Sequence, residues 1–207
     1  MKIYDFKGFP NPARVRIALA EKGMTRRVEF VTVDVPGGAH KRSEFLAKNP
    51  AGAVPVLELE DGTTIAECTA ITEYLDNLDG NPVLTGKNAK ERAVVHMMQR
   101  RAEAGLLDAA ATYFHHATPG LGPHIETYQN REWGEKNRER ALAGMRYLDS
   151  VLAGQPYLAG ERFSMADITA FAGLLFADIA KIAIPADLEN LRAWRGRIAE
   201  RPSVAQA

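Results

Sequence analysis

The sequence is poor in cysteine and carries no excess of charge of either sign. Its one cysteine, Cys68, excludes an internal disulfide framework and a metal site built from several cysteines. The 26 basic and 26 acidic side chains cancel, so no basic field favours nucleic acid and no polybasic segment favours a membrane surface. The sequence therefore predicts a small molecule or a protein as partner, and no metal.

Long hydrophobic runs are also missing. No apolar stretch is long enough to cross a bilayer, and the opening residues MKIYDFKGF hold no apolar signal core. A cytoplasmic location is the resulting expectation. The chain has 207 residues with 46% hydrophobic content, which is enough for one large domain or two small ones with a real core.

The first part of the chain predicts a compact α/β domain that ends near residue 79. A strand over residues 2–6 precedes a helix over residues 12–22, with Asn11 at its N-cap. The alternating segment at residues 28–35 predicts a second strand. A helical crossover between two strands gives a parallel pair.

The stretch at residues 53–75 organises the rest of this domain. Asp61-Gly62 is a strong hairpin signal between two short apolar segments, and a helix follows from Glu67 with apolar residues at a spacing of three and four. Proline lacks the N–H that a strand interior needs, so Pro55 is expected where a strand begins. Residues 40–49 are expected to form a short helix or helical loop.

Residues 80–87 are rich in Gly, Asn and Pro and are expected to form a linker. Everything from residue 88 to residue 207 is predicted to be helical, with helices over 89–117, 132–152, 168–182 and 188–200. Ser164 and Asp167 have the spacing of a capping box, which predicts the start of a buried helix.

Five segments of the chain stand out together: VRIALAEKG at 15–23, EFLAKNPAGAVPVLE at 44–58, AECTAITEYL at 66–75, FSMADI at 163–168 and the RPSV tail. In combination they resemble the cytosolic glutathione S-transferases (GSTs), over essentially the whole chain. The resemblance implies the GST fold, an α/β thioredoxin-like N-terminal domain (1–79) followed by an all-α C-terminal helical domain (88–207). The chain looks closest to an atypical fungal and bacterial branch that lacks the usual catalytic Tyr, Ser or Cys.

The resemblance also implies a set of glutathione-binding residues. Val54 would pair with the cysteinyl unit through its main chain, next to a cis bond at Pro55. Glu67 and Cys68 open a helix whose free N–H groups suit the γ-glutamyl carboxylate, and Glu67 would meet the ammonium group. The last members of the set are His40 and Lys41, expected at the glycyl carboxylate, and Asn11. A solvated basic pair is the alternative for His40 and Lys41, and a small inert helix-start residue is the alternative for Cys68.

Catalysis by this family requires that the glutathione thiol be held as a thiolate, because a free thiol has a pKa of about 8.5. Without the usual donor, the candidates are the Asn11 amide, N–H groups of the first helix or a bound water. A plain N-cap is the alternative for Asn11. His115 is the second catalytic candidate, and an exposed polar stripe or a dimer contact is its alternative. Residues expected to line a second-substrate pocket in the helical domain are Met98, Arg101, Tyr113 and His116, although such side chains are more often core.

The leading hypothesis is an enzyme, a glutathione S-transferase that conjugates the glutathione thiolate to small hydrophobic electrophiles. Glutathione would be a co-substrate, no metal would take part, and a homodimer is expected from the resemblance. A non-catalytic glutathione-binding or ligand-binding protein with the same fold is the alternative. A structural module of a larger assembly is a third hypothesis, which is disfavoured because the chain begins and ends with the fold.

Overall fold

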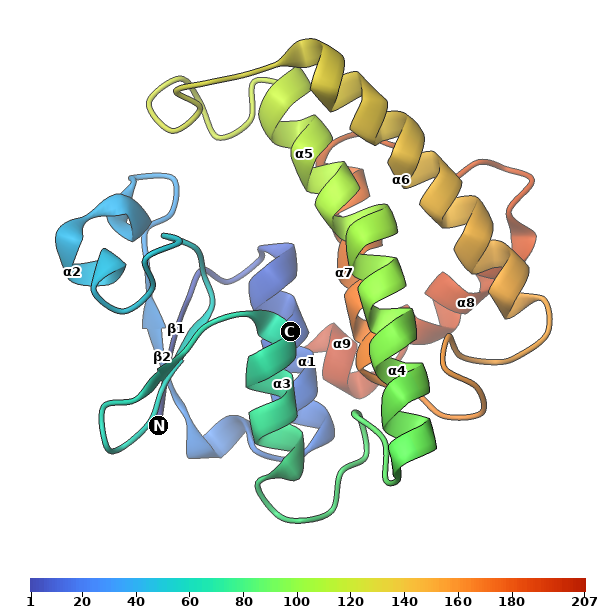
Figure 1. Cartoon of the computed structure of the whole chain (residues 1–207), viewed down its shortest axis with the longest axis horizontal. Helices are drawn as coiled ribbons and strands as arrows, with labels where there is room; N and C mark the ends of the chain where they lie inside the picture. The colour runs from blue at the N-terminus through green and yellow to red at the C-terminus, as the bar shows by residue number, and fades with distance from the viewer. The chain divides into compact units, whose positions relative to one another are not determined.

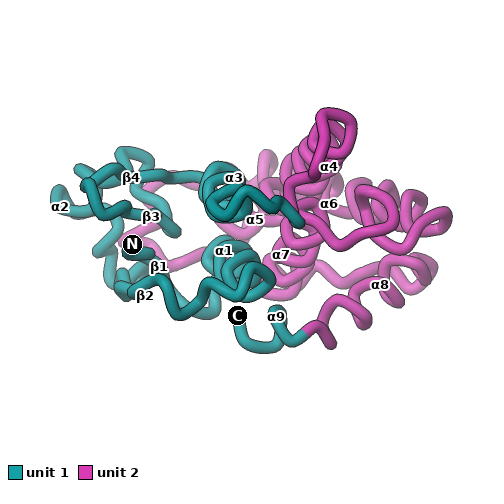
Figure 2. The backbone as a smooth tube through the Cα atoms, turned by 90° about the horizontal axis from the view of Figure 1, so that it is seen from below, with its two compact units in different colours: residues 1–83, 202–207 teal, residues 84–201 magenta.

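The computed structural model describes residues 1–207 and divides them into two compact units (Figure 2). Unit 1 comprises residues 1–83 together with residues 202–207, and unit 2 comprises residues 84–201. The division splits the expected linker 80–87 between the two units, and it assigns the last six residues, expected in the 88–207 domain, to unit 1. They pack with unit 1, where the Ser203 hydroxyl donates to Glu21. No helix is long and apolar enough to pass through a bilayer.

Unit 1 is an α/β unit built on one small mixed sheet. Its elements are β1 (Lys2–Asp5), α1 (Pro10–Glu21), β2 (Glu29–Thr32), α2 (Ser43–Leu46), β3 (Val56–Glu58), β4 (Thr64–Ile65), α3 (Cys68–Asn77) and α9 (Pro202–Ala205), with 3-10 turns at Thr25–Arg27 and Ala39–Lys41. The strand order is β2-β1-β3-β4. β1 and β2 are parallel, and the other two pairs are antiparallel. The thioredoxin-like fold expected from the sequence is therefore confirmed.

Alternation along the strands gives this sheet two different faces. Ile3 and Leu57 lie opposite each other across β1 and β3 and are fully buried in a core with Leu19 and Ile71, from the helices α1 and α3. The two helices lie side by side in Figure 1. The other face carries Val56, which packs in a smaller cluster under α2. The sheet is thus covered on both faces, and its residue spacing decides which helix each strand residue meets.

The start of α1 corrects one expectation. The helix begins at Pro10, and Phe9 is its N-cap, because the Phe9 carbonyl accepts the first helical hydrogen bond from Ala13 N at 3.0 Å. Proline suits the first helical position, where its missing N–H is not needed. The N-cap assignment of Asn11 is wrong: Asn11 sits inside the first turn, and its side chain is available for other contacts.

Unit 2 is entirely helical. Its elements are α4 (Ala89–Ala102), a π-helical segment (Glu103–Leu107), α5 (Asp108–Ala117), α6 (Arg131–Leu152), α7 (Met165–Ile179) and α8 (Glu189–Ala199). The expected helix over 89–117 is continuous but widens at the π segment, where α6 packs alongside. A Cβ on Gly144 of α6 would lie 2.3 Å from the Gly105 carbonyl oxygen. Glycine at position 144 is therefore what allows the two backbones to meet.

The capping box at the start of α7 is confirmed and forms the polar centre of unit 2. The Asp167 carboxylate is fully buried and accepts hydrogen bonds from Leu158 N at 2.9 Å, Ser164 N and Oγ at 3.0 Å each, and Trp194 Nε1 at 3.2 Å. One side chain thereby ties a loop and α8 to the start of α7. Burial raises the pKa of Asp167 to about 6, against the opposing effect of its hydrogen bonds.

We predict that Asp167→Asn lowers the stability of the protein and changes its dependence on pH. An amide cannot accept all four hydrogen bonds, and each buried donor left without a partner costs about 1–3 kcal/mol. The Asp167 carboxyl holds its proton more tightly in the folded protein than in the unfolded chain, where its pKa has the ordinary value of about 3.9. The contribution of Asp167 to the free energy of unfolding is therefore largest below about pH 4 and falls as the pH rises through about 6.

Urea unfolding of the wild type and of Asp167→Asn over this pH range measures the effect. The stability difference between them should shrink as the pH rises, and two parallel pH profiles would contradict the prediction. Asp187→Asn is the control, because Asp187 forms an exposed ion pair with Arg146 at 2.8 Å, and such pairs contribute about 0–1 kcal/mol.

Candidate functional site

The main chain at Val54 is an open edge of unit 1. The Val54-Pro55 peptide bond is cis, as the resemblance implies, and β3 begins only at Val56. The N–H and C=O of Val54 form no hydrogen bond within the protein, whereas the preceding loop is well bonded. Asn49 is buried and donates to Ala53 O at 2.8 Å while accepting from Ala51 N at 3.1 Å. The edge is therefore positioned by a fixed loop and can accept an extended peptide.

The start of α3 places an exposed carboxylate at the N-terminal end of the helix. Glu67 is the N-cap, with a positive φ of 68°, and its exposed side chain forms no hydrogen bond or ion pair. The first N–H groups of a helix have no acceptor within that helix and carry partial positive charge. An amino acid head group, with one carboxylate and one ammonium group, fits this pair of features.

Cys68 faces the interior instead of this surface. Its thiol is buried and donates to the main-chain oxygen of Asn11 at 3.4 Å. A buried thiol bonded to a carbonyl serves as a small packing residue that links α3 to α1. Its position supports the role as a helix-start residue, and the contribution of Cys68 to ligand binding would come from its main chain.

His40 and Lys41 form a basic corner beside the loop before Val54. The His40 imidazole is 5% exposed, and its Nδ1 is a buried nitrogen with no hydrogen-bond partner. Burial, followed by the charge of Lys41, lowers the pKa of His40. The Lys41 ammonium donates to Gly52 O at 3.0 Å, which leaves it two further donors. Both side chains therefore have hydrogen-bonding capacity that the protein itself does not use.

The Asn11 side chain lies in a small polar cluster between α1 and α3. Its Oδ1 accepts from Arg14 Nη1 at 3.1 Å, and Arg14 Nη2 also reaches Thr69 Oγ1 at 3.4 Å. Proline at positions 10 and 12 removes two main-chain donors from this turn, and Ala13 N is bonded to Phe9 O. The N–H groups still available in the first turn are therefore those of Asn11, from its main chain and its amide.

The Tyr4 hydroxyl is used elsewhere in the structure. It donates to Glu58 Oε2 at 3.0 Å, and the Lys48 ammonium binds the same carboxylate. This cluster joins β1, β3 and the residues after α2. Tyr4 is therefore a packing residue of the sheet.

His115 in unit 2 is paired with a carboxylate that the sequence analysis missed. Its Nδ1 lies 2.7 Å from Glu126 Oε1, and Glu126 also accepts from Leu121 N at 2.9 Å. The Glu126 side chain is 9% exposed and that of His115 is 37% exposed. An ionised carboxylate can only accept, so the ring proton resides on Nδ1. The Nε2 of a neutral His115 then has a free lone pair.

The four candidates for the second-substrate pocket fall into two groups along the continuous helix formed by α4, the π segment and α5. Met98 is buried, and its sulfur accepts from the Tyr147 hydroxyl, which in turn accepts from Arg101 Nη1 at 2.6 Å. Tyr113 and His116 lie near the far end, where His116 contacts Tyr128. At 1.5 Å per residue, the 15 positions between Arg101 and His116 correspond to about 20 Å. Whether the two groups line one pocket stays a prediction.

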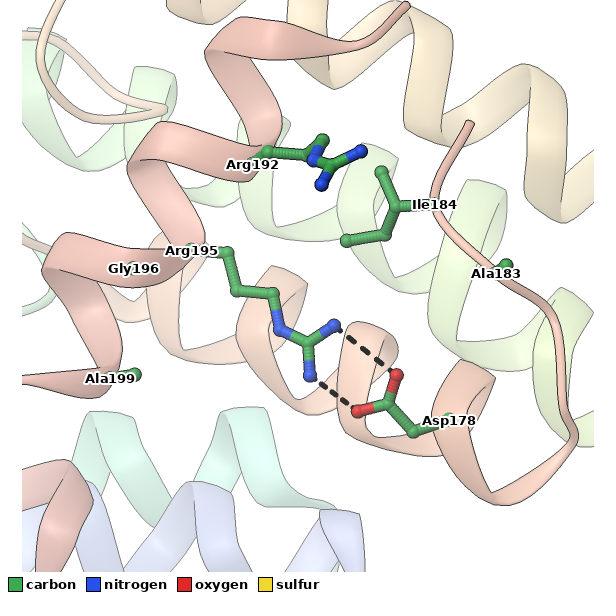
Figure 3. Close-up of a pocket in the computed structure, with 7 residues that line it drawn as sticks. All are labelled: Asp178, Ala183, Ile184, Arg192, Arg195, Gly196 and Ala199. Carbon is green, nitrogen blue, oxygen red and sulfur yellow. Dashed lines mark hydrogen bonds and ion pairs between the residues drawn. The ribbon is translucent and has the colours of Figure 1, made fainter. Parts of the chain in front are cut away.

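A separate cavity of about 490 Å³ lies between the end of α7 and α8 (Figure 3). Its lining includes Ile184 and Arg192, and the Arg195 guanidinium forms an ion pair with Asp178 there. None of the predicted site residues takes part in it.

The chain matches two protein-family models and several solved structures. Residues 10–78 match the glutathione S-transferase N-terminal domain, and residues 107–202 match the glutathione S-transferase C-terminal domain. The chain is 61% identical to glutathione S-transferase 2 of Saccharomyces cerevisiae over 204 residues, which are 99% of this chain and 88% of that protein. This chain belongs to the glutathione S-transferase family.

Solved structures agree with this assignment. The crystal structure of Gtt2 from S. cerevisiae superposes with a TM-score of 0.98 at 61% identity, covering 100% of this chain and 99% of that one. A glutathione S-transferase domain-containing protein of Marinobacter aquaeolei gives 0.97 at 61% identity, covering 99% and 100%. A Gtt2-class enzyme of Vibrio parahaemolyticus gives 0.84 at 33% identity, covering 99% and 95%. The protein is thus a transferase of the family that uses glutathione as a substrate.

Three residues near the candidate sites of this GST were missed by the sequence analysis: Asn49, Arg14 and Glu126. Each is a polar side chain whose role depends on a partner brought to it by folding. Arg14 and Asn49 lie in helix and loop segments that carry no charge pattern of their own. Glu126 follows His115 by 11 residues, beyond the reach of the helical spacing rules.

We predict that Asn49→Ala weakens glutathione binding by this GST. The substitution removes two hydrogen bonds that fix residues 49–53 and thereby loosens the edge at Val54. A loss of about 1–2 kcal/mol corresponds to a roughly tenfold higher Kd for glutathione, measured by calorimetric titration. Asn77→Ala is the control, because Asn77 bonds to Glu73 within α3. An equal change of Kd in both variants would contradict the prediction.

Proposed function

We propose that this GST binds glutathione on unit 1 and transfers its thiolate to small hydrophobic electrophiles, without a catalytic Tyr, Ser or Cys. The observation that carries this proposal is the pair of unused main-chain groups at Val54. A peptide backbone needs one donor and one acceptor in an extended arrangement, and Val54 offers both. The cysteinyl unit of glutathione is the natural occupant, because it lies at the centre of the tripeptide.

The two charged ends of glutathione match polar groups of the protein other than those of Val54. Glu67 and the first turn of α3 suit the γ-glutamyl ammonium and carboxylate. His40 and Lys41 suit the glycyl carboxylate, since Nδ1 of His40 and two Lys41 hydrogens have no partner in the protein. A bound carboxylate would favour the protonated imidazole and raise the pKa of His40 from its lowered value.

Asn11 is the proposed donor to the sulfur. The thiol loses its proton to solvent water, the sulfur electron pair attacks the electrophilic carbon, and a leaving group such as chloride departs with the electrons of its bond. A hydrogen bond to the sulfur favours the thiolate over the thiol. The main-chain N–H of Asn11 and its side-chain amide both lack an acceptor within the protein.

Replacing Asn11 tests this role. We expect Asn11→Ala to raise the pKa of bound glutathione by about one unit and to lower kcat/KM about tenfold at neutral pH, because one donor is lost. Asn11→Asp keeps an acceptor for Arg14 but adds a negative charge near the sulfur, so its loss should be greater. Turnover of a chloronitrobenzene and the ultraviolet absorbance of bound thiolate provide the measurements.

The same absorbance separates the enzyme from the alternative, a non-catalytic glutathione-binding or ligand-binding protein. A bound glutathione that shows thiolate at neutral pH supports the transferase mechanism. Tight binding with no thiolate signal and no turnover would favour the carrier. Unchanged kcat/KM in both Asn11 variants would remove Asn11 from the mechanism.

His115 is proposed as a second catalytic residue, which acts through a water. The bond from its Nδ1 to Glu126 fixes the tautomer that leaves Nε2 as an acceptor. A carboxylate in this position also stabilises the imidazolium that forms when Nε2 takes a proton. Unit 2 additionally holds the proposed second-substrate residues, Met98 with Arg101 in one group and Tyr113 with His116 in the other. The homodimer and the cytoplasmic location stay predictions.

We predict that His115→Ala lowers kcat at least tenfold, with little change in the Kd for glutathione, since general-base groups contribute about 10²–10⁴-fold. Glu126→Gln retains the acceptor oxygen and loses the charge, so it should give an intermediate kcat. His96→Ala on α4 is the control and should leave turnover unchanged. Steady-state kinetics and glutathione titration supply the two readouts, and wild-type kcat in His115→Ala would exclude the role.

A further inference from the structure

Arg14 is a buried cation next to the proposed sulfur donor. It lies one turn into α1, and only 4% of it is exposed. One nitrogen of its guanidinium, Nη1, lies 3.1 Å from Asn11 Oδ1, and Nη2 lies 3.4 Å from Thr69 Oγ1. The planar guanidinium therefore connects the first turn of α1 with the first turn of α3.

The chemistry of this contact fixes which end of the Asn11 amide faces which way. A guanidinium has only donors, so the atom that meets Arg14 has to be the carbonyl oxygen. The Cys68 thiol is also a donor, and it points at the Asn11 main-chain oxygen at 3.4 Å and at Oδ1 at 3.9 Å. The NH₂ end of the amide consequently points away from Arg14, and no group of unit 1 accepts a hydrogen bond from it.

We infer that Arg14 is a positioning residue, which holds the Asn11 carboxamide by its oxygen and so presents the NH₂ end to the glutathione sulfur. This inference rests on the proposed function of Asn11. With the amide reversed, Oδ1 would face the thiolate and repel it. The charge-assisted bond also draws electron density from the amide, and hydrogen-bonded chains of this kind strengthen the donor at their end.

The orienting role differs from two other ways in which Arg14 could affect the reaction. A direct effect of its positive charge on the thiolate would not depend on the residue at position 11. A purely structural role would lower stability and leave the bound thiol unchanged. Arg14 and Cys68 are the titratable groups that hydrogen-bond to Asn11, so the difference spectrum between glutathione-bound and free protein is needed to remove the signal of Cys68.

A double-mutant cycle on Arg14 and Asn11 tests the inference. The pKa of bound glutathione is measured from the thiolate absorbance as a function of pH in the wild type, Arg14→Met, Asn11→Ala and the double variant. We expect Arg14→Met to raise that pKa, giving up to about a tenfold loss of kcat/KM at neutral pH. In the Asn11→Ala background the same substitution should produce no further shift. The effect should appear in kcat more than in KM.

Arg16 supplies the control, because it lies on the same helix and its guanidinium is partly buried and ion-paired. Its partners are Asp5 at 2.7 Å and the Phe30 ring, away from Asn11. Arg16→Met should lower the melting temperature without moving the pKa of bound glutathione. If Arg14→Met fails to fold, Thr69→Val is used instead, since it removes the hydroxyl that Arg14 Nη2 contacts at 3.4 Å and should shift the thiol pKa in the same direction by less.

The outcomes separate the inference from the function on which it rests. A shift from Arg14→Met that is equal in the wild-type and Asn11→Ala backgrounds overturns the orienting role while the function of Asn11 stands. An unchanged thiol pKa in Arg14→Met, with a clear shift in Asn11→Ala, overturns it as well. No shift in Asn11→Ala alone contradicts the proposed function itself.

Discussion

Pro55 determines where the sheet of unit 1 stops, and the proposed binding edge depends on that. Proline has no N–H to give to a ladder, and β3 begins only after it, at Val56. The residue just before, Val54, is thereby left with a main-chain donor and acceptor that no part of the protein uses. Main-chain polar groups in folded proteins are nearly always paired, so an open pair in a fixed loop is a place for another peptide.

Other polar groups of unit 1 that are proposed to bind glutathione also lack partners within the protein. His40 has a buried nitrogen without a partner, Glu67 has a carboxylate without a cation, and Asn11 has an amide whose oxygen alone is bonded. By contrast, the polar residues that hold the frame are saturated. Asp167 accepts four hydrogen bonds, and Glu58 receives both Tyr4 and Lys48. The polar groups with hydrogen-bond partners stabilise the fold, and those without partners are the ones that we propose bind the ligand.

Local sequence signals predicted most of the secondary structure. The Asp61-Gly62 turn, the parallel β1–β2 pair and the capping box at Ser164 all rest on neighbours close in sequence, where turn and cap preferences are strong. The errors occurred where several neighbouring residues compete for one position, or where a tertiary contact decided the outcome. Asn11 carries a typical N-cap side chain, yet two prolines shift the helix start and Arg14 binds its oxygen. The packing of the chain end at α9 on α1 has no local signal.

The sequence alone determined three things: the family resemblance, the order of the elements and the residue types of the proposed glutathione site. These depend on composition, spacing and turn chemistry. The tertiary structure decided which groups are paired and which are left open. The unused main-chain groups of Val54 and the Glu126 partner of His115 follow from folding, and the orientation of the Asn11 amide depends on Arg14, which α3 holds through Thr69. A single sequence does not reveal these hydrogen-bond partners, because they are brought together only when the chain folds.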